Sequence, residues 1–331
     1  MSYIRLDIDD LEVTRAKVKE AFLQKDNGIA AIMDKVTVNQ SEQAKTRKVF
    51  AVDSGYNSAY ETTFALFKAA VVDEEMKVDR SEDIYLFHVD NYQTDRLKRL
   101  LMQQSLYRAL FKTIQSGRAD DSMVLIDGTI TLGLFIPTPT DRREYRMHYK
   151  DIYEQLYTPL MEQCLKRNIL ALGFLKRTGS NYLAEHLGLR GIYDIYIINA
   201  LLRKHGQNIG PILVPNASSH SVRIRQKYVT FYLNLKGWNY RFELLREQEQ
   251  HSRESVGNLL HVATEAHRGM NPVFSKADEY ARVTKREADL KFDYVTHDLD
   301  ADERTRMRLE ARTRTHFGYS AARIPGRMPS R

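Results

Sequence analysis

Cysteine is nearly absent from this chain, which has a single one, Cys164, among its 331 residues. One thiol cannot form an intramolecular disulfide and cannot build a cysteine-rich zinc cluster. The sequence also lacks an apolar run of about 18 residues, so no transmembrane helix is expected. The N-terminus lacks the basic and then apolar profile of a signal peptide. These absences predict a cytoplasmic protein with no membrane partner.

The composition is that of a globular protein with a modest basic excess. Hydrophobic residues make up 43% of the chain, charged residues 28%, and the net charge is +7. A chain of this length can bury a sizeable core, as one large domain or two ordinary ones. Residues 304–331 contain eight arginines and one acid, Glu310. We interpret 299–331 as a basic tail, either a solubilising extension or an arm that binds phosphates.

Two short apolar segments end in the same way. Residues 49–52 (Val-Phe-Ala-Val) precede Asp53-Ser-Gly, and residues 123–126 (Met-Val-Leu-Ile) precede Asp127-Gly-Thr. Apolar runs bounded by such residues predict buried strands that end at turns. Open α/β sheets bind ligands at the carboxyl ends of neighbouring strands. Two carboxylates converging there would suit Mg²⁺ or Mn²⁺, which take oxygen ligands.

Each acid taken singly has a simpler interpretation. Asp followed by Gly is ordinary turn chemistry, because Asp bonds its own backbone and Gly supplies a positive φ. An actin-like ATPase would use the same two segments as phosphate loops, but it also needs a late Gly-Gly element, which the sequence lacks. A P-loop pattern is absent as well. Repetition of the whole pattern favours metal ligation, and the turn interpretation remains open.

The segments around the two acids predict the fold class. Strands are expected at 62–72 and 83–89, followed by a long helix at 93–116. With the strands that lead into Asp53 and Asp127, the order is strand, strand, strand, helix, strand. By fold-level analogy this is the order of an RNase H-like core, whose first three strands form an antiparallel meander. We therefore predict an α/β protein with an RNase H-like mixed sheet, flanking helices and a helical insertion at about 141–167.

The rest of the chain predicts more of the sheet and its covering helices. Further elements are expected as strands at 169–176, 212–214, 229–235 and 241–246 and as helices at 252–266 and 276–291. Lys176 and Arg177 stand at the end of the first of these strands beside small hydroxyl residues, which suits a phosphate; a solvated turn is the alternative. A periodic segment at 10–35 predicts an amphipathic helix that packs on the core or docks a partner.

One further stretch resembles a known family. Residues 269–283 read Gly-Met-Asn-Pro-Val-Phe-Ser-Lys-Ala-Asp-Glu-Tyr-Ala-Arg-Val. They resemble the C-terminal signature of NurA nucleases, in which a turn with proline leads into a helix of the pattern Ala-His-x-x-Ala-x-Ile. The segments at Asp53, Asp127, 174–176 and 228–235 are similar to the family in the same order. The resemblance spans residues from about 45 to 290.

The resemblance implies an RNase H-like DNA nuclease that depends on Mn²⁺ or Mg²⁺. It implies that Asp53 and Asp127 are catalytic metal ligands, and that Asp278 is a third, at the position where the family usually has histidine. A carboxylate suits a hard cation at least as well as imidazole. Asp278 could instead be an N-terminal helix charge or cap. Lys176 and Arg177 would bind DNA.

One departure from the family affects the expected metal site. The family carries a glutamate on the helix before the fourth strand, whereas residues 96–118 contain no acid here. Gln104 is retained as a weak candidate ligand through its amide oxygen. The acids that could replace the missing glutamate are Asp90, Asp95, Glu61 and Asp194.

The resemblance also implies partners and a domain plan. The family forms dimers and works with a hexameric HerA-type DNA translocase in end resection. We therefore expect a homodimeric exo- or endonuclease that acts with such an ATPase in DNA end resection or degradation. A catalytically weakened DNA-binding scaffold subunit is the alternative. The corresponding plan is an N-terminal helical segment at 1–40 that docks the partner, a nuclease domain at 45–298 and the basic tail at 299–331.

Overall fold

The protein is seen in a computed structural model that describes most of the chain. The described residues are 36, 38–42, 44–59, 64–87, 92–176, 180, 182–189, 192–213, 228–264, 272–300, 302, 303 and 305. The expected N-terminal helix at 10–35 and most of the expected basic tail lie outside them. Within this part of the chain, no helix is long and apolar enough to cross a membrane.

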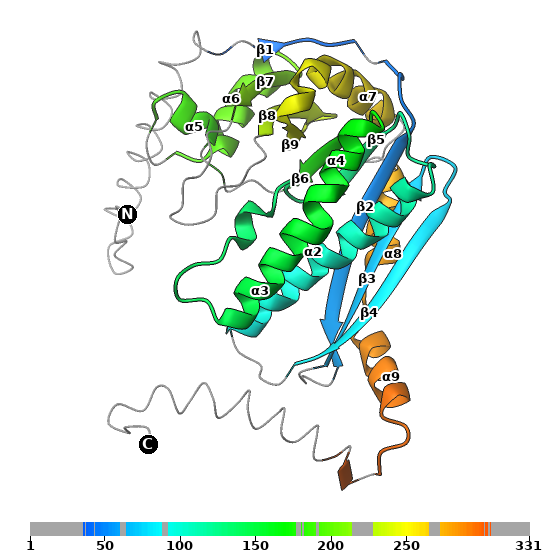
Figure 1. The fold of residues 1–331 in the computed structure, drawn as a ribbon. Coiled ribbons are helices and arrows are strands. Elements are labelled where there is room, and N and C mark those ends of the chain that lie inside the picture. Colours follow the sequence, from blue (N-terminus) through cyan, green and yellow to red (C-terminus); the bar gives the residue numbers. More distant parts are fainter. Residues whose placement is uncertain are drawn as a thin grey trace, which may run out of the picture.

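A mixed sheet of nine strands organises the described residues, in the order β1-β7-β8-β9-β6-β5-β2-β3-β4 (Figure 1). Neighbours β2 and β5 are parallel, as are β5 and β6, and the other neighbouring strands are antiparallel. The strands are β1 (Val38–Asn39), β2 (Val49–Ser58), β3 (Phe64–Asp73), β4 (Val78–Leu86), β5 (Met123–Asp127), β6 (Leu170–Leu175), β7 (Asn208–Leu213), β8 (Tyr228–Leu235) and β9 (Trp238–Leu245).

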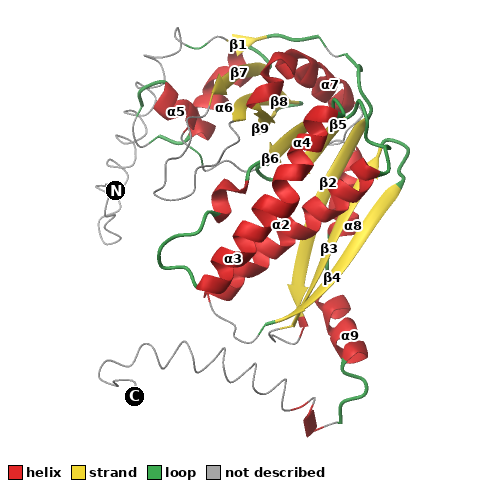
Figure 2. Cartoon of the chain, viewed as in Figure 1, coloured by secondary structure: helices red, strands yellow, loops and turns green. Residues whose placement is uncertain are grey.

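Helices cover both faces of this sheet (Figure 2). On one face α2, α3 and α4 pack over β2 and β5, and on the other face α7 and α8 pack over the same sheet. The helices are α2 (Tyr92–Gln115), α3 (Arg143–Ile152), α4 (Thr158–Lys166), α5 (Tyr182–His186), α6 (Asp194–His205), α7 (Ser252–Thr264), α8 (Pro272–Ala281) and α9 (Lys285–Val295), with shorter helical turns η3 (Leu132–Phe135), η4 (Tyr153–Tyr157) and η5 (Arg246–His251).

The predicted fold class is confirmed. Strands β2, β3 and β4 form the expected antiparallel meander, α2 follows, and β5 then pairs in parallel with β2. This is the RNase H-like order of elements. The helical insertion expected at 141–167 is present as α3, η4 and α4, which continue one another along the chain. Three of its four tyrosines, Tyr145, Tyr149 and Tyr157, are buried in the core.

Several predicted boundaries were wrong. Strands β7 and β9 begin at Asn208 and Trp238, four and three residues before their predicted starts. Strand β2 continues through Asp53 to Ser58, so this acid lies inside a strand and not at its end. Strand β4 begins at Val78, five residues before the predicted start. The helix expected at 276–291 is two helices, because Thr284 accepts a hydrogen bond from the backbone of Glu287 in a capping box that begins α9.

Candidate functional site

Strand pairing brings Asp53 and Asp127 side by side. In the parallel pair of β2 and β5, Val52 lies opposite Ile126, so the next residue of each strand is an aspartate. Side chains alternate between the faces of a sheet. Because Val52 and Ile126 face the α2 layer, both aspartates point to the other face, toward α8. The sequence pattern therefore identified two residues that the fold makes neighbours.

The environment of Asp53 disfavours a negative charge. The residue is 5% exposed, and its Oδ1 accepts a hydrogen bond of 2.6 Å from the backbone N–H of Ser54. Burial and the neighbouring Asp127 raise the pKa of Asp53 to about 8, against a smaller lowering effect of Lys176. Two adjacent carboxylates with little water around them repel each other when both are ionised. An added cation would relieve that repulsion.

Lys176 lies beside both strand aspartates at the end of β6. Its Nζ is 3.4 Å from Asp127 Oδ2 and 3.7 Å from Asp278 Oδ1. The ammonium group also lies 4.4 Å from the ring centroid of Phe274, on α8. Phe174, two residues earlier on the same face of β6, meets Phe274 edge-on at 4.7 Å between centroids. Packing of α8 on β6 thus positions the lysine between acids from a strand and a helix.

Asp278 reaches the site because α8 lies very close to β2. A Cβ on Gly55 would be 2.7 Å from the backbone oxygen of Ala281, so only glycine permits this approach. Gly55 therefore serves packing inside a strand, whereas Gly128, with φ of +96°, is a true turn residue after Asp127. The Asp278 side chain is 41% exposed and pairs with Arg282 at 3.4 Å.

The structure does not bring Gln104 to the aspartates. This residue lies on α2, where the Tyr85 hydroxyl donates to its Oε1 at 3.4 Å, and α2 covers the face of the sheet opposite Asp53. The prediction that Gln104 is a weak metal ligand is therefore wrong, because the sheet lies between its side chain and the two aspartates. The side chain of Gln104 reaches Tyr85 on β4, a contact that the spacing of the helix alone did not reveal.

The alternative acids are not at the site either, where they are described. Asp95 is an exposed residue of the first turn of α2. Asp194 is buried and accepts hydrogen bonds from the hydroxyls of Ser180 and Tyr232 and from the N–H of Ala184, so it joins α6 to α5 and β8. Glu61, Asp90 and the predicted DNA-binding Arg177 lie outside the described residues.

The strand aspartates fit a divalent cation as a two-carboxylate site. Among the described residues, no three side chains of the histidine, cysteine, aspartate and glutamate types converge at metal-binding distance. Asp278 does not join the two strand aspartates, because the ammonium group of Lys176 lies between Asp278 and Asp127. Asp53, which is buried, and Asp127, which is half-buried, nevertheless supply adjacent carboxylate oxygens whose mutual repulsion a cation would relieve. Oxygen donors are the ligands that Mg²⁺ and Mn²⁺ select.

Sequence reasoning missed one acid near this site. Glu243 on β9 is fully buried, and its Oε2 accepts hydrogen bonds from Thr129 Oγ1 at 2.6 Å and from the backbone N–H of Ile130 at 3.0 Å. These two residues belong to the loop that follows Asp127. The available signal was a glutamate between Phe242 and Leu244 inside a predicted strand, two residues after Arg241. Charged residues are rarely fully buried unless they are paired.

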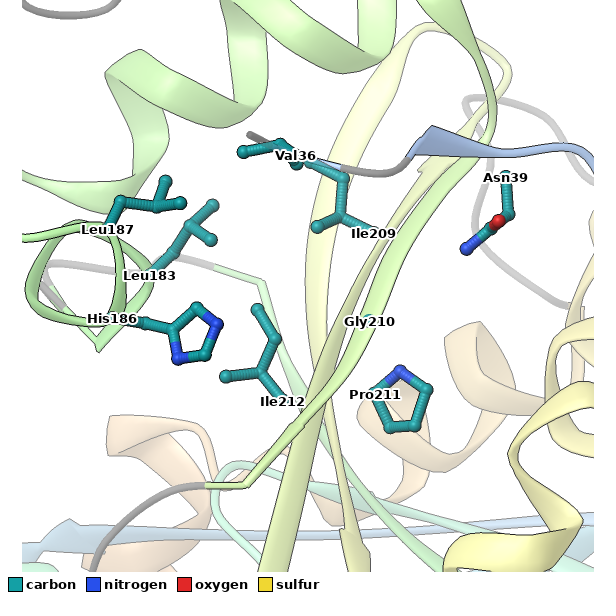
Figure 3. A pocket seen from close by; sticks show the side chains of 9 residues that line it. All are labelled: Val36, Asn39, Leu183, His186, Leu187, Ile209, Gly210, Pro211 and Ile212. Atoms are coloured by element: carbon teal, nitrogen blue, oxygen red, sulfur yellow. The ribbon is translucent and has the colours of Figure 1, made fainter. Parts of the chain in front are cut away.

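A separate hollow lies toward the end of the sheet that is formed by β1 and β7. It has a volume of about 240 Å³ and is bordered by helix α5 and by strand β7, which lies next to the edge strand β1 (Figure 3). Leu183, Ile209 and Ile212 give it apolar walls, and His186 and Asn39 lie at its border. Strands β8, β9 and β6 separate β7 from β5. The hollow is therefore distinct from the aspartate site.

Comparison with known proteins gives one family and several similar structures. The family model described as the NurA domain matches residues 47–283. This range contains all three aspartates and Lys176. No protein with a curated description matches the chain.

The similar structures share the fold at low sequence identity. The crystal structure of the NurA nuclease from Sulfolobus solfataricus is 18% identical with a TM-score of 0.61, and the match covers 88% of this chain and 99% of that one. A crystal structure of NurA is 11% identical with a TM-score of 0.56, covering 89% and 98%. A crystal structure of NurA with manganese is 12% identical with a TM-score of 0.54, covering 87% and 99%.

Proposed function

The chain belongs to the NurA domain family, and from that premise we propose that it is a nuclease that hydrolyses DNA phosphodiester bonds with a bound divalent cation. The observation that carries the proposal is the side-by-side placement of Asp53 and Asp127 on one face of the sheet. Its setting supports the same conclusion, because the pKa of Asp53 is raised to about 8 and Lys176 lies next to the pair.

Each residue of the site has a proposed role. Asp53 and Asp127 hold the cation, and Asp278 supplies a further carboxylate from α8. Bound Mn²⁺ or Mg²⁺ would polarise the scissile phosphate and lower the pKa of an attacking water. Manganese is favoured because one similar structure is that of NurA with manganese. The ammonium of Lys176, now paired with Asp127 and Asp278, would neutralise a phosphate oxygen of the DNA.

A scaffold without catalysis is the second candidate function. The observation that favours it is the absence of an acid from residues 96–118, where the family carries a glutamate. With fewer negative charges a second cation would bind weakly, and two-metal phosphodiester cleavage would be slow. Such a subunit would still bind DNA.

A metal titration separates the two candidates. We expect the purified protein to cleave labelled linear duplex DNA when Mn²⁺ is added and to stop when EDTA removes it. Asp278→Asn should raise the Mn²⁺ concentration needed for half-maximal cleavage by about 10-fold. This is the lower end of what the loss of a supporting group costs in metal affinity. Glu279→Gln is the matched control, since this neighbouring residue is exposed and pairs with Lys276. DNA binding without cleavage at every Mn²⁺ and Mg²⁺ concentration would establish the scaffold instead.

We further propose that the protein is a homodimer that docks on a HerA-type hexameric ATPase in DNA end resection or degradation. The family resemblance supports this partner, and the described insertion offers a surface for it. Helix α3 presents Arg143, Arg146 and Lys150 to solvent along one side, because residues three and four apart share a helix face. That side is turned away from the buried Tyr145 and Tyr149.

Co-elution with the cognate ATPase in size-exclusion chromatography tests both docking surfaces. Deleting residues 1–35 is expected to reduce the co-eluting fraction several-fold without changing Mn²⁺ affinity. The double variant Arg143→Glu/Arg146→Glu tests α3 in the same way, with Lys166→Glu on the exposed end of α4 as its charge-reversal control. If either changed protein still elutes as the full complex, the surface removed from it is not the interface.

A further inference from the structure

The loop after Asp127 lies directly on strand β6. Gly128 donates its backbone N–H to the carbonyl of Phe174 at 3.0 Å, which extends the pairing of β5 with β6 by one residue. The chain then crosses Gly173. A Cβ at Gly173 would be 2.5 Å from the backbone N of Ile130 and 2.9 Å from the backbone O of Gly128. Glycine is therefore required beneath this loop.

Glu243 reaches the same loop from the other side of Gly173. The two residues are directly opposite each other in the antiparallel pair of β6 and β9. Because Gly173 has no side chain, the carboxylate of Glu243 extends across it and accepts hydrogen bonds from Thr129 Oγ1 and the Ile130 N–H. Its other oxygen pairs with the guanidinium of Arg241, which is also buried.

From this geometry we propose that Glu243 is a positioning residue for the metal site: by binding the loop at Thr129 and Ile130, it fixes the carboxylate of Asp127 beside Asp53. The inference rests on the proposed function, because it assigns the site a cation to be held. The hydrogen bonds of Glu243 go to Thr129, Ile130 and Arg241 and not to either aspartate. Glu243 therefore acts through the backbone that follows Asp127.

The physical argument has two parts. A buried carboxylate must be fully paired to be tolerated, and here Arg241 and two loop donors provide that pairing. A metal ligand must also be placed within about 0.5 Å of its working position, which requires support from surrounding groups. Changes to such supporting groups typically cost 10–100-fold in metal affinity. Glu243 is such a supporting group, because it accepts hydrogen bonds from the loop that follows Asp127.

The test removes the acceptor without leaving a buried charge unpaired. In Arg241→Met/Glu243→Leu both partners become apolar, a change that is often neutral for folding. We expect this variant to fold and to lose about 10–100-fold in Mn²⁺ affinity by isothermal titration calorimetry. It should also lose hydrogen-exchange protection at the Ile130 amide. Arg241→Met/Glu243→Gln, which keeps an acceptor oxygen for the loop, should recover most of both.

A second variant keeps the test decisive if the apolar pair does not fold. Gly173→Ala leaves Glu243 and Arg241 unchanged but places a methyl group 2.5 Å from the Ile130 nitrogen, so the loop must shift. The same fall in Mn²⁺ affinity is expected. Wild-type Mn²⁺ affinity in a folded variant of either kind overturns the inference.

The outcomes also separate this inference from the proposed function. If the unaltered protein binds Mn²⁺ and cleaves DNA while the variants bind Mn²⁺ equally well, the positioning role is wrong and the function stands. If the unaltered protein binds no Mn²⁺, the proposed function fails. The Ile130 exchange measurement, which needs no metal, then reports whether Glu243 fixes the loop.

Discussion

Asp53→Asn is expected to abolish metal-dependent DNA cleavage while leaving the protein folded. The substitution keeps the size of the side chain and removes the charge that a cation would bind. Even the loss of a group that only supports a metal ligand costs 10–100-fold, so the loss of the ligand itself should reduce cleavage by more than about 100-fold. Cleavage of labelled linear duplex with saturating Mn²⁺ is the measurement, and circular dichroism checks the fold.

Ser54→Ala is the matched control for this variant. Ser54 is the next residue on β2, and strand alternation points it to the α2 face, away from Asp127. The control should cleave at the unaltered rate. If Asp53→Asn keeps full activity while it is folded and saturated with Mn²⁺, the assignment of the site to the two strand aspartates is wrong.

The same Asp53→Asn substitution is expected to stabilise the metal-free protein at high pH. In the folded protein the pKa of Asp53 is raised to about 8 by burial and by Asp127, whereas an unfolded chain releases this proton near pH 4. Between these two values the folded state binds more protons than the unfolded state. The free energy of unfolding therefore falls as pH rises through this window, and the effect is complete above pH 8.

The asparagine variant has no proton to lose at this position. Each unit of pKa corresponds to about 1.4 kcal/mol, so a pKa raised from about 4 to about 8 sets an upper limit of roughly 5–6 kcal/mol. Because the Asp127 side chain is 29% exposed and water screens its charge, we expect a smaller gain, on the order of 2–4 kcal/mol at pH 9. Chemical denaturation in EDTA at pH 5, 7 and 9 measures it, and the difference between the two proteins should grow with pH. An unaltered protein that is the more stable of the two at pH 9 contradicts the argument.

Added Mn²⁺ should reverse the ranking. A ligand that binds only the folded state stabilises it by mass action, and only the protein with Asp53 retains the paired carboxylates. At pH 8 the melting temperature of the unaltered protein is expected to rise with Mn²⁺, while that of Asp53→Asn stays nearly constant. Together the two experiments describe a site whose unfavourable charge repulsion is relieved by the cation it is built to bind.

Local sequence patterns predicted the strands of the sheet better than they predicted which side chains meet across its layers. The runs before Asp53 and Asp127 were identified as strands because short apolar runs bounded by turn residues such as Asp and Gly are typical of buried strands. Their pairing followed from fold-level analogy. The end of β2 was misjudged, since Gly55 was interpreted as a turn residue although it is needed for the close approach of α8. A glycine gives the same signal in both settings.

The sequence by itself determined the α/β class, the order of the core elements and the two aspartates that become neighbours, because each depends on short-range periodicity and on parallel pairing of two similar strands. Tertiary structure alone decided which other side chains reach them. Strand alternation turns the aspartates toward α8, so Asp278 and Lys176 meet them and Gln104 on α2 does not. Tertiary structure also placed Glu243 next to the loop at Ile130, which stands 113 residues earlier in the chain. Such contacts join residues distant in sequence through packing, and no local pattern encodes the packing of one layer on another.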